Sequence, residues 1–158
     1  MALYAHPSPT APLIGEGHAA AVRRLGLDPG APVRNGHRHP PGSEAAARQY
    51  DAFIEDCLAG GTRAALVHTD QDAILLLQRL RARGLRTPED MALIAYDDEL
   101  AALAEVPLTA VAPAKEQLGA CAARLLVDRL DAPGGSALRS VAVQPRLVVR
   151  RSCGSVQH

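Results

Sequence analysis

Two short apolar segments, joined through an apolar helical segment, limit the fold most strongly. Residues 63–68 and 91–95 have the length and composition of buried strands. Residues 71–83, between them, carry apolar side chains at helical spacing, and Gly84 follows as a stop. A strand, a helix and a second strand with short connections form the repeating unit of a parallel sheet.

The rest of the chain continues this alternation. Residues 1–12 contain three prolines, and we expect them to form an irregular lead-in. Ser43 precedes one helical segment as an N-cap, and Pro113 opens another. The further segments expected are helices at 13–25, 44–58 and 114–130 and strands at 31–33, 106–111, 141–143 and 147–149. The sequence therefore predicts an α/β fold, with a parallel sheet flanked by helices.

The composition indicates one globular domain with no electrostatic bias toward nucleic acid or membrane. The chain has 158 residues, of which 47% are hydrophobic, and this is enough for a substantial core. Seventeen basic residues balance seventeen acidic ones, so no net charge attracts the chain to phosphates or lipid head groups. We interpret Lys115, the only lysine among many arginines, as compositional bias.

Cysteine usage and the N-terminal sequence indicate the compartment. Cys57, Cys121 and Cys153 are widely spaced and form no CxxC motif, which argues against a disulfide framework or a structural zinc site. We find no apolar run long enough to cross a bilayer and no signal-peptide pattern. We therefore expect a cytoplasmic protein that has no membrane partner.

Short polar side chains follow both strands of the central unit. Asp97 and Asp98 lie just past the second strand, and Thr69 and Asp70 lie just past the first. Ligands of open parallel sheets bind outside the carboxyl ends of the strands, so these side chains face one crevice. Carboxylates accept hydrogen bonds from hydroxyl groups, which suits a polyol or sugar. For Asp70 and Asp98 the alternative is capping of backbone amides, whereas for Asp97 we favour the ligand.

Three stretches of the chain carry a family resemblance. They are ALVHTDQDAILLLQRLRARGLRTPEDMALIAYDDE, PLTAVAPAKEQLGACAARLLVDRL and PRLVVRRS. Five short motifs follow one another in a specific order and spacing. They are a polar pair after the first strand, Pro-Glu-Asp, Tyr-Asp-Asp, Pro-Leu-Thr and a closing Pro-x-Leu-Val-x-Arg. From about residue 62 to residue 152, this pattern resembles the C-terminal part of the effector-binding core of the lactose-repressor (LacI/GalR) family. Residues 10–27 resemble the preceding family helix more weakly.

The resemblance implies a periplasmic-binding-protein-like core whose two lobes close on a small molecule. Residues 13–111 would form its C-terminal lobe, and residues 112–143 an excursion that packs on the N-terminal lobe. Residues 144–151 would form a return strand, and residues 152–158 a tail. We expect the N-terminal lobe and the DNA-binding headpiece to be absent from this chain. The chain would then be either a fragment of a longer regulator or a short relative.

The resemblance also implies roles for single residues. Asp97 stands at the family position whose carboxylate binds effector hydroxyls, and Thr69 replaces a family asparagine. Ile14 stands where the family has an effector-binding arginine, and Pro113 occupies a further polar position. Arg38 can supply the crevice with a charge that Ile14 does not. The expected ligand-binding residues are Asp97, Thr69, Asp70 and Arg38.

We expect neither a metal centre nor a catalytic site, and no cofactor. His37 and His39 could lie on one side of a strand, but they lack a third ligand nearby, so a solvated loop is favoured. The serines occur in no nucleophile-elbow context, and the side chains of two adjacent aspartates diverge rather than pair. His68 could act as a base, although a hydrogen-bonded core histidine is more common. The chain is therefore expected not to be an enzyme.

The helix at 71–83 is apolar on more than one side. One side packs on the sheet, and the other packs either under neighbouring helices or on a second copy of the chain. The family resemblance favours a homodimer, because family subunits associate partly through this helix and through the segment after the aspartate pair. The expected interface residues are Leu77, Leu80, Leu100 and Leu103.

The favoured hypothesis is the effector-sensing and dimerisation part of a LacI-family transcriptional regulator. It would bind a sugar or similar small polar ligand in an interlobe cleft, and it would contact operator DNA only through a headpiece absent from this chain. One alternative is a truncated stand-alone module that dimerises without a ligand, which Ile14 and Pro113 favour. Another is a solute-binding protein of the same fold.

Overall fold

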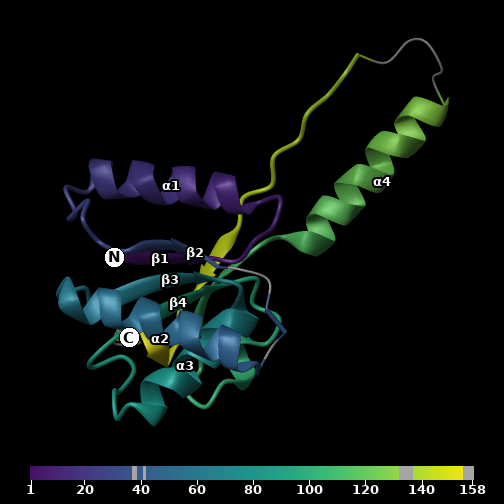
Figure 1. The fold of residues 1–158 in the computed structure, drawn as a ribbon. Helices are drawn as coiled ribbons and strands as arrows, with labels where there is room; N and C mark the ends of the chain where they lie inside the picture. The colour runs from purple at the N-terminus through teal and green to yellow at the C-terminus, as the bar shows by residue number, and fades with distance from the viewer. Residues whose placement is uncertain (37–38, 41, 132–136, 155–158) are drawn as a thin grey trace.

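The computed structural model describes residues 1–36, 39–40, 42–131 and 137–154 (Figure 1). In these residues, six strands form one sheet in the order β2-β1-β3-β4-β5-β6. The strands are β1 (Ala2–Ala5), β2 (Val33–Asn35), β3 (Ala64–His68), β4 (Ala92–Tyr96), β5 (Thr109–Ala112) and β6 (Arg146–Val148). Neighbouring strands are parallel from β2 to β5, and β6 is antiparallel to β5. The α/β class is thus confirmed, with a mixed sheet in place of the expected parallel one.

Helices lie on both faces of the sheet. The helices are α1 (Ala11–Arg24), α2 (Glu44–Ala59), α3 (Asp70–Ala82) and α4 (Lys115–Asp131), with short 3-10 turns η1 (Ala101–Leu103) and η2 (Arg151–Cys153). Figure 1 shows α1 on one face and α2 and α3 on the other. It also shows α4 projecting away from the sheet, and residues 137–145 returning to β6. No side chain of α4 is buried.

Local sequence signals explain where the helices of the main body begin and end. The Ser43 hydroxyl accepts a hydrogen bond from the backbone N–H of Ala46 at 3.2 Å, as expected of an N-cap. At the start of α3, the Asp72 carboxylate accepts the backbone N–H of Thr69 at 3.2 Å. Gly84 follows α3 with a φ of +75°, which glycine adopts without steric cost.

The main hydrophobic core lies between the sheet and the pair α2 and α3. Alternate residues of the central strands face it, among them Val67 and Leu93, which have no exposed surface. Phe53, Ile54 and Leu76 meet them from the helices and are also fully buried. Each such side chain contributes about 1.5–3 kcal/mol through removal of its surface from water. This core fixes the strand ends that carry the polar residues described below.

The prediction of an irregular lead-in at residues 1–12 is wrong for residues 2–5. These residues form β1, which pairs with β2 on one side and β3 on the other, and every side chain in it is buried. The segment Ala-Leu-Tyr-Ala has no β-branched residue and is followed by prolines, so its local signal for a strand is weak. Burial within the sheet overrides that weak propensity.

Two further boundaries differ from the prediction. Residues 141–143 form no strand, because this extended segment has no neighbouring strand with which to pair. Ser152, placed in a tail, is fully buried. Its hydroxyl donates to the carbonyl of Leu93 at 2.6 Å and accepts the N–H of Thr109 at 2.8 Å. The start of the expected tail is therefore fastened to the ends of two strands.

The four leucines expected at a dimer interface occupy different environments. Leu80 has no exposed surface and Leu77 is 7% exposed, so both pack inside a single chain. Leu100, just before η1, is 39% exposed, and Leu103, in η1, is 81% exposed. The prediction for Leu80 is corrected, because a side chain enclosed by its own chain cannot contact a second copy. The apolar character of α3 reflects packing on the sheet and against α2.

This difference in burial predicts a difference in stability. Leu80→Ala should lower the free energy of unfolding by about 2–5 kcal/mol, because it leaves a cavity in the core. Leu103→Ala should change it by less than about 0.5 kcal/mol, because that side chain is exposed. Urea unfolding followed by circular dichroism measures both values. Equal effects of the two substitutions would contradict the assigned packing of α3.

Candidate ligand-binding site

Polar side chains follow the carboxyl ends of four neighbouring strands. We call this end of the sheet, where the strands terminate, its carboxyl edge. His6 follows β1, Thr69 follows β3, Asp97 follows β4, and Lys115 lies three residues after β5. The order β1-β3-β4-β5 in the sheet places these residues in a row in that sequence. All four strands are parallel, so their carboxyl ends meet at one edge. This edge is where ligands of open α/β sheets bind.

A cavity of about 700 Å³ opens at the end of this row where α4 begins. It is lined by the loop after β4, the first turn of α4 and the approach to β6, with Asp97, Asp98, Glu99, Lys115, Gln144 and Arg146 among its walls. Its volume lies within the range of roughly 300–1,000 Å³ that small-molecule sites occupy. The polar lining of this cavity suits a hydrophilic ligand.

Asp97 and Lys115 form the charged centre of the cavity. The Lys115 ammonium lies 3.1 Å from a carboxylate oxygen of Asp97 and also contacts Glu99. The hydrogen bond to Glu99 raises the pKa of Lys115, and the bond to Asp97 adds to this effect against the opposing influence of burial. Lys115 therefore stays charged at neutral pH. An ammonium has three N–H donors, so one remains for a ligand.

The loop that presents Asp97 has an unusual backbone. Asp97 and Asp98 have φ values of 99° and 61°, a region that non-glycine residues seldom adopt. Asp70 holds the following residues in place. One of its carboxylate oxygens accepts the backbone N–H groups of Glu99 at 2.8 Å and Leu100 at 2.6 Å. Of the two roles considered for Asp70, capping of backbone amides is the one that these contacts show.

Asp98 is held by a different partner. Its carboxylate lies 2.6 Å from the Arg150 guanidinium, and the same guanidinium nitrogen donates to the carbonyl of Leu108 at 2.8 Å. Both side chains of the pair are largely buried. Asp98 therefore ties the loop after β4 to the segment after β6, and among the described residues it accepts no backbone amide.

Thr69 and Asp72 form a second polar group further along the edge. The Asp72 carboxylate accepts hydrogen bonds from the Thr69 hydroxyl at 3.3 Å and from the Tyr50 hydroxyl at 2.5 Å. Burial, together with this bond to Asp72, raises the pKa of Tyr50, so its hydroxyl remains a donor. Nδ1 of His6 lies 3.0 Å from the same carboxylate. Thr69 is thus positioned at the edge by Asp72.

Asp97 and Thr69 follow the adjacent strands β4 and β3. Asp97 lines the cavity and Thr69 does not, whereas Asp70 has its carboxylate in use behind the edge. Arg38 lies outside the described residues. Lys115 and His6 belong to the edge but were not recognised in the sequence. Lys115 could have been found from its singularity in an arginine-rich chain, whereas nothing near His6 in the sequence points to Asp72.

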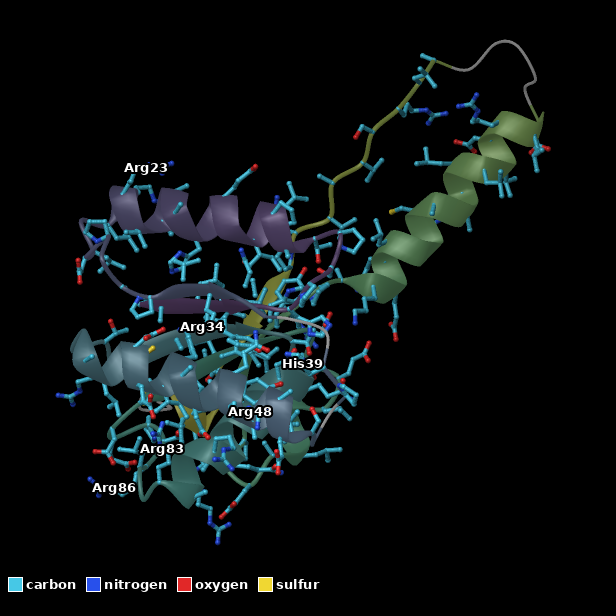
Figure 2. The ribbon with its side chains drawn as sticks, in the orientation of Figure 1. Arg23, Arg34, His39, Arg48, Arg83 and Arg86 are labelled. Carbon is cyan, nitrogen blue, oxygen red and sulfur yellow. The ribbon has the colours of Figure 1, made fainter. Side chains whose placement is uncertain are left out.

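The arginines near the end of α3 are paired with carboxylates and do not form a basic patch for nucleic acid. Arg79, Arg81, Arg83 and Arg86 pair with the carboxylates of Asp51, Glu105, Glu55 and Asp90, respectively. Figure 2 shows Arg83 and Arg86 at the end of the sheet opposite to His39 and the start of α4.

Within the described part of the chain, no group of three or more His, Cys, Asp or Glu residues could hold a metal ion. The same part contains no helix with the length and hydrophobicity that a bilayer span requires.

Comparison with known protein families shows to which family this chain belongs. A model of the periplasmic-binding-protein-like domain matches residues 1–153. The chain belongs to this family. Its relatives and structural neighbours place it with the effector-binding core of LacI/GalR regulators, as the sequence pattern indicated.

Several members of the family are similar in sequence or structure. The arabinose metabolism transcriptional repressor of Geobacillus stearothermophilus is 33% identical over 86 residues, which are 54% of this chain and 24% of the repressor. The repressor CytR of Escherichia coli K12 is 30% identical over 119 residues, 73% of this chain and 33% of CytR. The structure of a CelR–cellobiose complex has a TM-score of 0.77 at 28% identity, and the match covers 96% of this chain and 46% of CelR. This periplasmic-binding-protein-like chain therefore spans only 24–33% of these two curated relatives.

His68, behind the edge, is a buried histidine without a partner for one ring nitrogen. Its side chain is 3% exposed, and Nδ1 forms no hydrogen bond with the described residues. The ring packs edge-on against Tyr96 with centroids 5.2 Å apart. Burial lowers the pKa of His68, and the nearby Asp97 carboxylate opposes this effect only in part. His68 is therefore neutral in the folded chain near pH 7.

Folding should consequently weaken as the pH falls. Below about pH 6.5, the ordinary pKa of histidine, the unfolded chain binds a proton at His68 that the folded chain does not yet bind, so the free energy of unfolding decreases. His68→Phe removes this titration and retains the ring. We expect unfolding curves at about pH 7.5 and about pH 5.5 to differ more for the wild type than for this variant. The same pH dependence in both proteins would exclude the role of His68.

Proposed function

We propose that this chain is the effector-sensing part of a LacI-family transcriptional regulator, located in the cytoplasm, and that it binds a sugar or similar polyol at the carboxyl edge of its sheet. The observation that supports this proposal most strongly is the Asp97–Lys115 pair at 3.1 Å in the wall of the cavity. We assign the chain no enzyme activity, because its relatives named above are transcriptional regulators.

The chemistry of this pair favours hydroxyl groups over ions. A hydroxyl both donates and accepts hydrogen bonds, so one ligand hydroxyl can donate to Asp97 while a second, or the same one, accepts from Lys115. An anionic ligand gains from Lys115 but is repelled by Asp97 and Glu99. A cationic ligand must displace the Lys115 ammonium from its two carboxylates. A neutral polyol meets neither cost.

The relatives support a sugar ligand by analogy. One structural neighbour is CelR in complex with cellobiose, and another is a LacI-family regulator from Arthrobacter sp. FB24 in complex with lactose. Because the present chain spans about half of the CelR chain, sugar sensing and operator binding by a complete regulator are part of the proposal.

The division of the chain follows from the same proposal. We infer a lobe that includes residues 13–111 and an excursion at 112–143 that packs on a second lobe, followed by a return strand at 144–151. The exposure of α4 supports this division, because its Leu118, Leu126 and Leu130 are 53%, 60% and 69% exposed. Apolar side chains at this density on one helix favour contact with another surface. The polyol would then lie in the cleft between the lobes.

A dimerising module without a ligand is the second candidate. The Lys115 ammonium already satisfies Asp97, and Ile14 supplies no polar group, so the edge is complete as an internal ion pair. The two functions differ in one respect that can be measured. A sensor loses affinity for a polyol when Asp97 is changed, whereas a module without a ligand has no affinity to lose.

Asp97→Asn should weaken polyol binding at least several-fold. The substitution keeps the size and one acceptor oxygen but removes a charge-assisted hydrogen bond, which contributes about 1.5–3 kcal/mol. Isothermal titration calorimetry with cellobiose, lactose, ribose and arabinose measures the loss. Glu105→Gln, a change at an exposed carboxylate paired with Arg81 on the protein surface, serves as the matched control. Unchanged binding by Asp97→Asn would remove Asp97 from the site, and no binding by the wild type would favour the module.

We also propose a homodimer that forms through η1 and the adjoining side of α3. Leu103 is 81% exposed and Leu100 is 39% exposed, and α3 carries the partly buried Ile74. The two elements contact each other, so these side chains can form one continuous apolar surface. A surface of this kind is typical of an interaction site.

Leu103→Glu should convert the dimer to a monomer without unfolding it. The substitution places a charge in the centre of the proposed interface, while it leaves the monomer core untouched because Leu103 contributes little to that core. Light scattering coupled to gel filtration measures the mass, and Leu138→Glu, at an equally exposed leucine elsewhere, is the control. A wild-type monomer, or a dimer that survives in Leu103→Glu, would contradict this interface.

A further inference from the structure

His6 is held in a defined orientation at the end of the edge opposite to Lys115. It is the first residue after β1, and its backbone N–H donates to the carbonyl of His68 at 2.8 Å. Nδ1 of its ring lies 3.0 Å from the Asp72 carboxylate. A neutral imidazole whose Nδ1 donates to a carboxylate presents Nε2 as a hydrogen-bond acceptor.

The carboxylate that orients His6 is itself held from two sides. Tyr50 donates its hydroxyl to one oxygen of Asp72, and the backbone N–H and hydroxyl of Thr69 donate to the other. The ring of Tyr50 lies against Tyr4, with centroids 5.4 Å apart, in the core. The orientation of the His6 ring therefore rests on α2, β3 and α3 together, through side chains with little freedom.

Part of the His6 side chain is open to solvent. The His6 side chain is 38% exposed, and Nε2 has no hydrogen-bond partner among the described residues. Asp72 already has donors on both oxygens from Tyr50 and Thr69, so its burial does not require His6. An imidazole that is oriented but not needed for the core resembles a ligand-binding group more than a structural one.

The length of the row limits the ligand. His6, Thr69, Asp97 and Lys115 follow four adjacent strands in the order β1, β3, β4 and β5. Strands lie about 4.8 Å apart, so the ends of β1 and β4, which carry His6 and Asp97, are about 10 Å apart. The Lys115 ammonium lies beside Asp97 at the same end of this row. The distance from His6 to Asp97 exceeds the length of a single sugar ring. A ligand that touches both ends must have at least two rings.

We propose that His6 is a specificity-determining ligand contact at the far end of this row, and that the ligand is an oligosaccharide of at least two rings. One ring binds at Asp97 and Lys115, and a hydroxyl of another ring donates to Nε2 of His6. This inference rests on the proposed polyol function and adds the size of the ligand and the residue that selects for it.

His6→Asn tests this role with little disturbance of the fold. The amide nitrogen of asparagine can occupy the place of Nδ1 and donate to Asp72, but no atom replaces Nε2. Titration calorimetry compares cellobiose with glucose and lactose with galactose, on the full chain and at concentrations into the millimolar range. His6→Asn should weaken disaccharide binding about three- to tenfold, the loss of one hydrogen bond. It should leave monosaccharide binding unchanged.

Lys115→Met is the companion variant, because it acts at the other end of the row. It should weaken binding of both disaccharides and monosaccharides, so the contrast between the two variants separates the two ends.

The thermal midpoint of unfolding of His6→Asn is measured in parallel and should equal that of the wild type. Tyr50→Phe provides an independent variant: it removes the hydroxyl that fixes Asp72 and should weaken disaccharide binding only.

Each outcome decides between the two proposals. Disaccharide affinity that is unchanged in His6→Asn, or monosaccharides that bind as tightly as disaccharides, would overturn the role of His6 and leave the polyol function standing. Equal losses for both sugar classes would show a general disturbance of the edge and would also overturn it. No binding of any of the four sugars to the wild type would overturn the polyol function and this inference with it.

Discussion

The loop after β4 keeps two consecutive aspartates at positive φ, and the position of the Asp97 carboxylate in the cavity wall depends on it. Such a conformation costs about 1–3 kcal/mol per residue and persists only where surrounding contacts determine it. Asp70, from the start of α3, accepts the two amides that follow the pair, and Arg150, from beyond β6, binds Asp98. The carboxylates of Asp70 and Asp98 are therefore engaged in holding the loop, whereas the Asp97 carboxylate pairs with Lys115 in the cavity wall.

This arrangement links the edge of the sheet to both segments that connect it with α4. Lys115, which pairs with Asp97, is the first residue of α4. Arg150, which pairs with Asp98, follows β6, where the chain returns. A ligand that changes the Asp97–Lys115 contact therefore acts where the chain leaves the sheet and next to where it comes back. This placement gives a physical route by which binding can bias the position of α4, as a population shift requires.

The sequence predicted the elements whose signals are local and strong. The apolar segments that became β3 and β4, the N-cap Ser43 and the terminating Gly84 lie where expected. It failed at β1, whose residues have weak strand propensity and are ordered by neighbours distant in sequence. The position of Asp97 and Thr69 at the ends of adjacent strands could be predicted, and their contact with a ligand stays a prediction. The partners Lys115 and Asp72, and the role of His6, depend on which strands become neighbours, and local patterns do not contain that information.

The measurement that tests the central claim most directly is chemical-shift mapping of the whole chain by heteronuclear NMR during titration with cellobiose. The account predicts that the largest changes occur at the backbone amides of Thr69 and Asp97 and at the Lys115 ammonium, with smaller changes at Glu99. Lys115 is the only lysine, so its side-chain signal is unambiguous. Changes confined to the exposed leucines of α4, or to residues away from the carboxyl edge, would contradict a polyol site built on the Asp97–Lys115 pair.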